Sequence, residues 1–137
     1  MRVVLDSSVL IAAAISRAGT SSAVLEDVIA HHELVISEYI LAEVERKLRD
    51  KLGFPVRDVR ALLTLLRQAA DIVTPVELPL TACRDAKDIP VLGTALSGKA
   101  AALITGDKDL LTLSSYEMTQ IIGPSRFWAL HGSTLDP

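Results

Sequence analysis

The sequence predicts an α/β fold in which helices pack against a parallel sheet. Short apolar runs without alternation recur along the chain, and segments with helical spacing of apolar residues separate them. Non-alternating runs are typical of strands that are buried on both faces, as in parallel sheets. Half of the residues are apolar but only 4% are aromatic, a composition that favours helices on a sheet over a β-sandwich.

The first half of the chain follows this pattern closely. We predict strands at 3–5 and 34–36, and helices over about 8–16, 20–32, 37–51 and 56–70. Gly19 follows the first helix, Ser37 is in place to cap the third, and Gly53 ends it.

The second half continues the alternation. We expect a strand within 71–75, a helix over 85–97, a strand at 101–104, a short helix over 109–113, a strand at 119–122 and a last helix over 124–128. Pro90 must lie in the first turn of its helix, where the missing N–H does no harm. This order implies a parallel sheet with right-handed crossovers. No repeat or linker interrupts it, so residues 1–137 are predicted to form one domain.

Composition restricts the cellular location and the binding partners that we expect for the protein. No apolar run reaches the roughly 18 residues that span a bilayer, and the N-terminus lacks the order of a signal peptide, so we expect no membrane association. Cys83 is the only cysteine, which excludes a disulfide framework and favours the cytoplasm. The net charge of −3 argues against a nucleic-acid binder, unless acidic residues gather around a cation and leave the remaining surface neutral or basic.

Two predicted strands end in a carboxylate that is accompanied by hydroxyl groups. Asp6 precedes Ser7 and Ser8, and Asp107 comes two residues after Thr105. Because the carboxyl ends of parallel strands share one edge of a sheet, the two carboxylates meet there if their strands are neighbours. The alternative is that each Asp only caps the helix that follows it.

Asp88 and Glu43 are two further candidate site acids, and each has an equally simple structural explanation. Asp88 lies at the start of a predicted helix, where the helix dipole favours an acid in any case. Glu43 lies on the shoulder of the apolar stripe of its helix, and pairs with Lys47 at i,i+4. Glu45 has an equivalent partner, so periodicity alone does not choose between the two glutamates.

A cluster of such acids needs a cation. Two carboxylates about 5 Å apart repel by roughly 3 kcal/mol at an effective dielectric of about 20. A dication or raised pKa values relieve this repulsion. Carboxylate and hydroxyl oxygens suit Mg²⁺ or Mn²⁺ much better than zinc, and the three histidines are not spaced as a ligand set.

Several motifs together carry a family resemblance. They read VVLDSSVLIAA, ISEYILAEVERKL, CRDAKDIPVLGTAL and LITGDKDLL, followed near the C-terminus by IIGPSRFWAL. Their order and spacing resemble the PIN domain family, in the subgroup assigned to the toxin components of toxin–antitoxin systems. The resemblance implies a three-layer α/β/α sandwich with a central, mainly parallel five-stranded sheet.

The resemblance also assigns roles to particular residues. The catalytic and metal-binding acids of the family fall on Asp6, Glu43, Asp88 and Asp107. The matching accessory positions are Ser8, Thr105 and Asp109. The chain departs from the family at Ser8, where Asn is frequent, and at Ile89, where a second acid often follows the first.

The implied activity is that of a Mg²⁺- or Mn²⁺-dependent endoribonuclease that hydrolyses RNA phosphodiester bonds, with an antitoxin protein as its partner. Candidate phosphate contacts are Arg46, Lys47, Lys99 and Lys108. The alternative is a PIN-like scaffold that binds RNA or protein with little catalysis. We also expect a homodimer, which Phe127 and Trp128 would seal, although core packing explains these two residues equally well.

Overall fold

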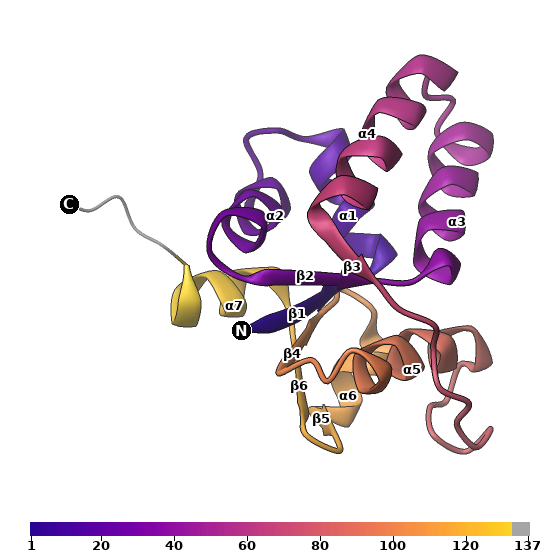
Figure 1. Ribbon diagram of the computed structural model, residues 1–137, viewed down its shortest axis with the longest axis vertical. Helices are drawn as coiled ribbons and strands as arrows, with labels where there is room; N and C mark the ends of the chain where they lie inside the picture. Colours follow the sequence, from indigo (N-terminus) through magenta and orange to yellow (C-terminus); the bar gives the residue numbers. More distant parts are fainter. Residues whose placement is uncertain (133–137) are drawn as a thin grey trace.

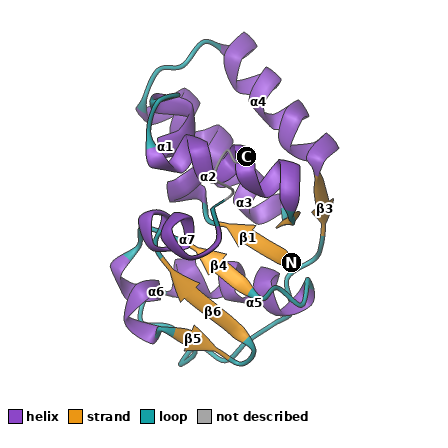
Figure 2. Cartoon of the chain, turned by 90° about the vertical axis from the view of Figure 1, so that its left-hand side faces the viewer, coloured by secondary structure: helices purple, strands orange, loops and turns teal. Residues whose placement is uncertain are grey.

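The computed structural model describes residues 1–132 and contains a sheet of six strands between two layers of helices (Figure 1). The strands are β1 (Arg2–Leu5), β2 (Glu33–Ile36), β3 (Ala70–Ile72), β4 (Ala102–Ile104), β5 (Ser115–Tyr116) and β6 (Thr119–Ile122). Their order is β3-β2-β1-β4-β6-β5, and all neighbours are parallel except β5 and β6. Figure 2 shows β1, β4 and β6 side by side.

The helices form in the segments that the apolar spacing indicates. They are α1 (Ser7–Ile15), α2 (Thr20–His31), α3 (Glu38–Arg46), η1 (Lys47–Lys51, a π-helix), α4 (Val56–Ala69), η2 (Ala86–Asp88, a 3-10 turn), α5 (Ile89–Ser97), α6 (Lys108–Leu113) and α7 (Pro124–His131). Helices α1 to α4 lie on one side of the sheet, and α5 and α6 on the other (Figure 1). The Ser37 hydroxyl accepts from the Ile40 N–H and caps α3.

The prediction of a three-layer α/β/α sandwich with a mainly parallel sheet is confirmed. The predicted number of five strands is wrong, because β5 adds a sixth. This strand has only two residues and pairs antiparallel with β6 across a tight turn in which Glu117 has φ 52°. A strand of that length has no periodicity to detect, so only its pairing reveals it. The predicted helix over 85–97 also begins as the 3-10 turn η2.

The two strands at the centre of the sheet explain the apolar runs. Val3, Val4 and Leu5 of β1 are fully buried, as are Leu103 and Ile104 of β4. Helices cover both faces of these strands, so neither face needs polar residues. Their paired register brings Leu5 beside Ile104, and therefore brings the segments that follow them together.

Helix α7 contains Phe127, one of the two residues expected to seal a homodimer. Phe127 is fully buried and its ring packs against those of His32 and His131, with centroids 5.8 and 5.2 Å apart. Core packing is therefore the right interpretation of Phe127. The homodimer stays a prediction, without Phe127 as its contact.

Within residues 1–132, no single helix is long and apolar enough to cross a membrane. Helices α1 and α2 reach that length and composition only as a pair, which is bent by 112°.

Candidate metal centre

A small recess lies at the carboxyl edge of the sheet, where β1 and β4 end. The Asp6 N–H donates to the Ile104 carbonyl at 3.0 Å, so the pairing of β1 with β4 continues to the first acid. The recess has a volume of about 100 Å³. Its lining residues are Asp6, Ser7, Ser8, Glu43, Lys47, Asp85, Lys87, Asp88 and Asp107. All four acids of the predicted quartet therefore line one recess.

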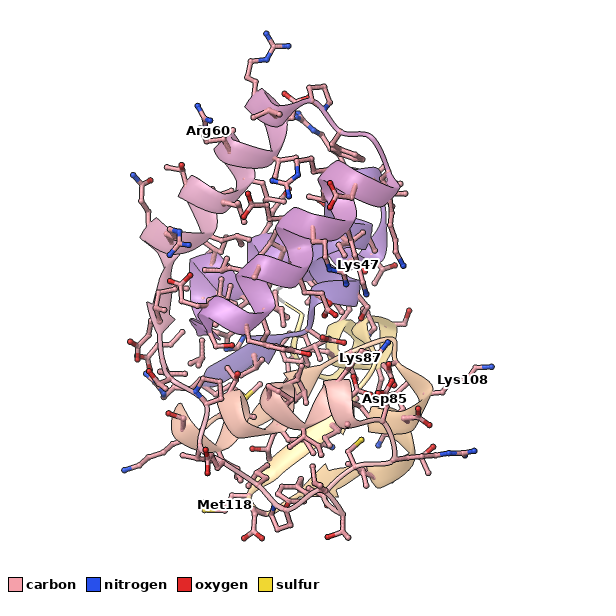
Figure 3. The ribbon with its side chains drawn as sticks, turned by 90° about the vertical axis from the view of Figure 1, so that its right-hand side faces the viewer. Lys47, Arg60, Asp85, Lys87, Lys108 and Met118 are labelled. Carbon is pink, nitrogen blue, oxygen red and sulfur yellow. The ribbon has the colours of Figure 1, made fainter. Side chains whose placement is uncertain are left out.

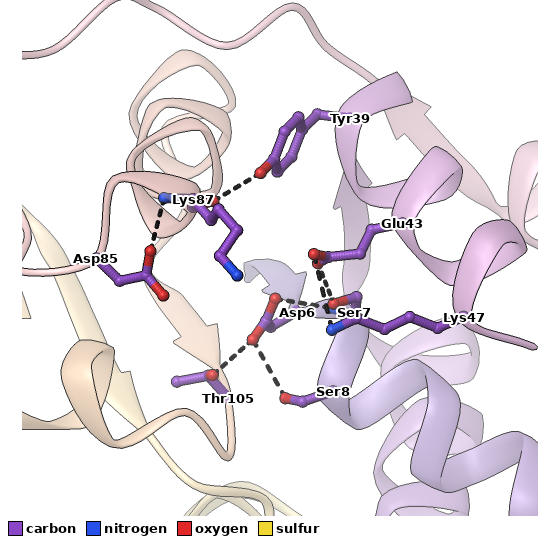
Figure 4. A network of polar contacts seen from close by, with 9 residues as sticks. All are labelled: Asp6, Ser7, Ser8, Tyr39, Glu43, Lys47, Asp85, Lys87 and Thr105. Carbon is purple, nitrogen blue, oxygen red and sulfur yellow. Dashed lines mark hydrogen bonds and ion pairs between the residues drawn. The ribbon is translucent and has the colours of Figure 1, made fainter. Parts of the chain in front are cut away.

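Asp6 is held by short hydrogen bonds on both of its carboxylate oxygens (Figure 4). Oδ1 accepts from the Ser7 N–H at 2.7 Å, and Oδ2 accepts from the Thr105 hydroxyl at 2.7 Å and the Ser8 hydroxyl at 3.2 Å. The side chain is only 4% exposed, and this burial raises the pKa of Asp6 although the hydrogen bond from Thr105 opposes the shift. The orientation of this carboxylate is thus set before any ligand arrives.

Asp107 is positioned by the first turn of α6. Its Oδ1 accepts from the N–H groups of Asp109 and Leu110, at 2.8 and 3.2 Å. Its own N–H donates to the Thr105 hydroxyl at 3.0 Å, so one hydroxyl group contacts both Asp6 and Asp107. Asp6 and Asp107 therefore each cap a helix and also lie at the same edge of the sheet. The helix-cap interpretation and the shared-site interpretation are both correct.

The accessory prediction for Ser8 has a structural basis as well. Besides donating to Asp6, the Ser8 hydroxyl accepts from the Gly106 N–H at 3.1 Å. It therefore ties the start of α1 to the loop between β4 and α6. Together with Thr105, it connects the two loops that carry the strand-end acids.

Glu43 reaches the recess from α3. Its Oε1 accepts from the Ser7 hydroxyl at 2.5 Å, and its Oε2 lies 3.7 Å from the Lys47 ammonium group. Glu45 instead points to the surface and pairs with Arg49 at 3.2 Å. The choice of Glu43 agrees with this arrangement. Sequence reasoning did not assign Ser7 to the site, since no local pattern shows which of two adjacent serines faces a distant helix.

Asp88 lies where η2 passes into α5 and is 8% exposed. Within residues 1–132 its buried Oδ2 has no hydrogen-bond partner. Burial, followed by the nearby charges of Asp107, Asp6 and Asp85, raises the pKa of Asp88 to about 7. A buried carboxylate with these neighbours is destabilised in its charged form unless a cation joins it.

Asp85 and Asp109 extend the acidic cluster around Asp88. One carboxylate oxygen from each of Asp85, Asp88 and Asp109 lies within 4.8 Å of the others. The accessory position predicted for Asp109 is therefore adjacent to the quartet. Sequence reasoning did not include Asp85 in the site; its one signal was a spacing of three residues from Asp88.

The donor set fits a hard dication. The residues that line the recess offer carboxylate and hydroxyl oxygens and no imidazole or thiolate. Mg²⁺ and Mn²⁺ prefer such ligands. The unpartnered oxygen of Asp88 is the point at which the protein alone leaves the site incomplete.

A further contact links helix α3 with the η2 turn at the edge of the site. The Tyr39 hydroxyl on α3 donates to the Lys87 carbonyl at 2.8 Å, and the Lys87 N–H donates to Asp85 Oδ1 at 3.0 Å (Figure 4). Burial and the charges of Glu43 and Asp88 raise the pKa of Tyr39, so the phenol stays a donor. The sequence contains no signal for this contact.

The predicted phosphate contacts do not all lie at the recess. Lys47 lines it, whereas Lys108 is exposed and extends away from the body of the protein (Figure 3). Lys99 lies between α5 and β4, at the amino end of that strand and hence at the opposite edge of the sheet. Arg46 is the last residue of α3 and is exposed.

Fold and site together define an α/β protein with an acidic centre at the carboxyl edge of a parallel sheet. The PIN domain model matches residues 2–109, and the chain therefore belongs to the PIN domain family. This confirms the resemblance that the motifs indicated.

One solved structure supports the fold. A chain in the crystal structure of VapBC2 from Rickettsia felis, bound to a DNA fragment from their promoter, superposes with a TM-score of 0.62 at 13% sequence identity. The match covers 90% of this chain and 98% of that chain. No curated protein matches the sequence.

Proposed function

We propose that this PIN domain is a Mg²⁺- or Mn²⁺-dependent endoribonuclease that hydrolyses RNA phosphodiester bonds. The observation that carries the proposal is the convergence of Asp6, Glu43, Asp88 and Asp107 on one recess. These acids come from four segments that are far apart in the chain. Two carboxylates roughly 5 Å apart repel by about 3 kcal/mol. Several such pairs would cost as much as the whole folding free energy of an ordinary domain, so a cluster of acids indicates a functional site.

The roles of the acids follow from how each is held. A bound cation would activate water, stabilise charge on the phosphorus and assist departure of the 3′-oxygen. Asp6 and Asp107 are the primary ligands, because backbone N–H groups hold both carboxylates and the Thr105 hydroxyl also donates to that of Asp6. Asp88 completes the set with its unpartnered oxygen.

Glu43 has a different role in this proposal. Ser7 holds one of its oxygens, while the other lies beside Lys47 at the rim of the recess. Glu43 Oε2 is therefore placed to orient the attacking water and to accept its proton. Lys47 lines the recess and balances the charge of this base.

The experiment compares the two glutamates that periodicity could not separate. We expect Glu43→Gln to reduce Mn²⁺-dependent cleavage of single-stranded RNA at least about 100-fold, as loss of a general base does. Glu45→Gln is the matched control and should cleave like the wild type, because Glu45 forms its ion pair with Arg49 on the surface and does not line the recess. Equal activity of Glu43→Gln and the wild type in a clean preparation would overturn the assignment.

The rival proposal is a PIN-like scaffold that binds RNA or protein with little catalysis. It predicts that the wild type binds single-stranded RNA and leaves it intact in Mn²⁺. No acid of the quartet is missing from the recess, and this favours the nuclease.

The second part of the proposal is a partner protein of the antitoxin type in the cytoplasm. The motif resemblance and the fold shared with a VapBC2 chain support it. An apolar groove of about 510 Å³ between α1, α2 and α4 offers a surface for an amphipathic segment of that partner. Ala13, Leu25 and Leu65 line it, and Leu65 is 47% exposed.

Co-expression with the product of a small adjacent gene tests the partner. We expect Leu65→Glu to abolish co-purification, while Met118→Glu does not, because Met118 is 92% exposed and lies outside the groove. Retention of the partner by Leu65→Glu would exclude this groove as its binding surface.

A further inference from the structure

Lys87 is exposed, but two side chains hold its backbone through hydrogen bonds. It lies in η2, between Asp85 and Asp88. Its N–H donates to Asp85 Oδ1 at 3.0 Å, and its carbonyl accepts from the Tyr39 hydroxyl at 2.8 Å. Side chains from two walls of the site therefore fix the point from which the Lys87 side chain extends.

That side chain lines the same recess as the four acids. In Figure 4 it extends from the η2 turn into the space beside Asp6 and Glu43, and Lys47 approaches from the other side. In this view the two lysines approach Asp6 and Glu43 from different sides.

The two lysines differ in what they contact. Lys47 forms an ion pair with Glu43 at 3.7 Å. Lys87 forms no ion pair with any residue in the described part of the chain, although several carboxylates line the recess with it. An ammonium group whose purpose was to neutralise these acids would approach one of them to ion-pair distance.

Charge balance indicates what the free ammonium group is for. The five carboxylates that line the recess and one dication leave three negative charges, which would repel an incoming phosphodiester. Lys47 and Lys87 line the same recess and offset two of these charges. Only Lys87 keeps its donors available, since Lys47 is engaged with Glu43.

We propose that Lys87 binds a phosphate oxygen of the RNA backbone at the site of cleavage, an inference that rests on the proposed ribonuclease function. The backbone of η2 fixes the point from which the Lys87 side chain reaches the recess. The substrate phosphate then lies between the acids that hold the cation and a lysine that contributes no ligand to it.

The test compares Lys87→Gln with Lys99→Gln, a lysine at the opposite edge of the sheet. Binding of a fluorescein-labelled single-stranded RNA is measured by anisotropy in Ca²⁺ over a range of salt concentrations. We expect Lys87→Gln to bind about tenfold more weakly, the loss typical of one charged hydrogen bond. The slope of log K against log salt should shrink by about 0.7, as for one phosphate contact on a single strand.

Mn²⁺ titration without RNA supplies a readout that is independent of RNA. Lys87→Gln should bind Mn²⁺ as tightly as the wild type or more tightly, because a positive charge beside the cation is removed. Lys87→Arg should restore RNA binding, and Lys99→Gln should behave like the wild type throughout.

Each other outcome has a defined meaning. If the wild type binds and cleaves RNA and Lys87→Gln keeps the same affinity and salt slope, the role of Lys87 is refuted and the nuclease stands. If Lys87→Gln loses Mn²⁺ binding or thermal stability along with RNA binding, its role is structural and the inference is refuted. If the wild type neither binds nor cleaves RNA, the proposed function fails and this inference fails with it.

Discussion

The Ser7 hydroxyl donates to Glu43 Oε1 at 2.5 Å, and this contact joins the first turn of α1 to the middle of α3. Ser7 is 3% exposed and its N–H also donates to Asp6. One residue therefore positions two acids that are 37 positions apart in the chain. The relative placement of Asp6 and Glu43 depends on it.

Removal of this hydroxyl tests that dependence. We expect Ser7→Ala to lower the rate of RNA cleavage at saturating Mn²⁺ by about tenfold, because a misplaced catalytic group has a cost of at least this order. The N–H bond to Asp6 remains, so Mn²⁺ affinity should change much less than the rate. A variant with wild-type kcat would show that Glu43 is oriented without Ser7.

Asp6→Asn separates the metal site from the fold. Asn still caps α1, and removal of a buried charge offsets the loss of an acceptor for the Thr105 and Ser8 hydroxyls, so the metal-free variant should stay folded and melt near the wild-type temperature. Mn²⁺ should raise the Tm of the wild type and raise that of the variant much less. Differential scanning fluorimetry with and without Mn²⁺ measures both; equal shifts in the two proteins would point to non-specific binding.

Thr105→Val tests the hydroxyl group that Asp6 and Asp107 share. The substitution keeps the shape but removes a donor to Asp6 and an acceptor for the Asp107 N–H, and we expect a loss of about 1–3 kcal/mol in unfolding free energy. Thr112→Val is the control, because the exposed Thr112 hydroxyl donates to the Lys108 carbonyl of its own helix and lies outside the acidic site. Its effect should stay within about 0.5 kcal/mol. Urea unfolding of both variants gives the comparison.

The raised pKa of Asp88 predicts how the stability of the metal-free protein changes with pH. Its pKa is about 7 in the folded protein against an ordinary value of 3.8, so between these values the folded state holds a proton that the unfolded state has lost. The stability that Asp88 contributes to the metal-free protein therefore falls as the pH rises toward 7, and is level above it. Bound metal must displace this proton below pH 7.

Melting curves at several pH values measure this dependence. The gain in Tm from Mn²⁺ should be larger at pH 8 than at pH 6, and Asp88→Asn should reduce the difference between the two. A gain that is equal at both pH values in the wild type would show that Asp88 does not take part in binding.

Much of the fold follows from local patterns. The non-alternating runs of β1 and β4 predict buried parallel strands, and helices on both faces of the sheet are what such runs require. The acids that follow these strands are predictable too, since parallel strands share their carboxyl edge. Glu43 is not predictable in this way, because periodicity treats Glu45 equally, and the family resemblance was needed to choose it.

The sequence by itself determined the α/β class, the central strands and the strand-end carboxylates Asp6 and Asp107, because these depend on residues that are close together in the chain. Only the tertiary structure decided that Ser7 contacts Glu43, that Asp88 keeps an unpartnered oxygen, and that Lys87 is anchored by Tyr39. Each of these depends on where one segment lies against another far along the chain, and local hydrophobic spacing carries no information about side-chain direction across such a contact.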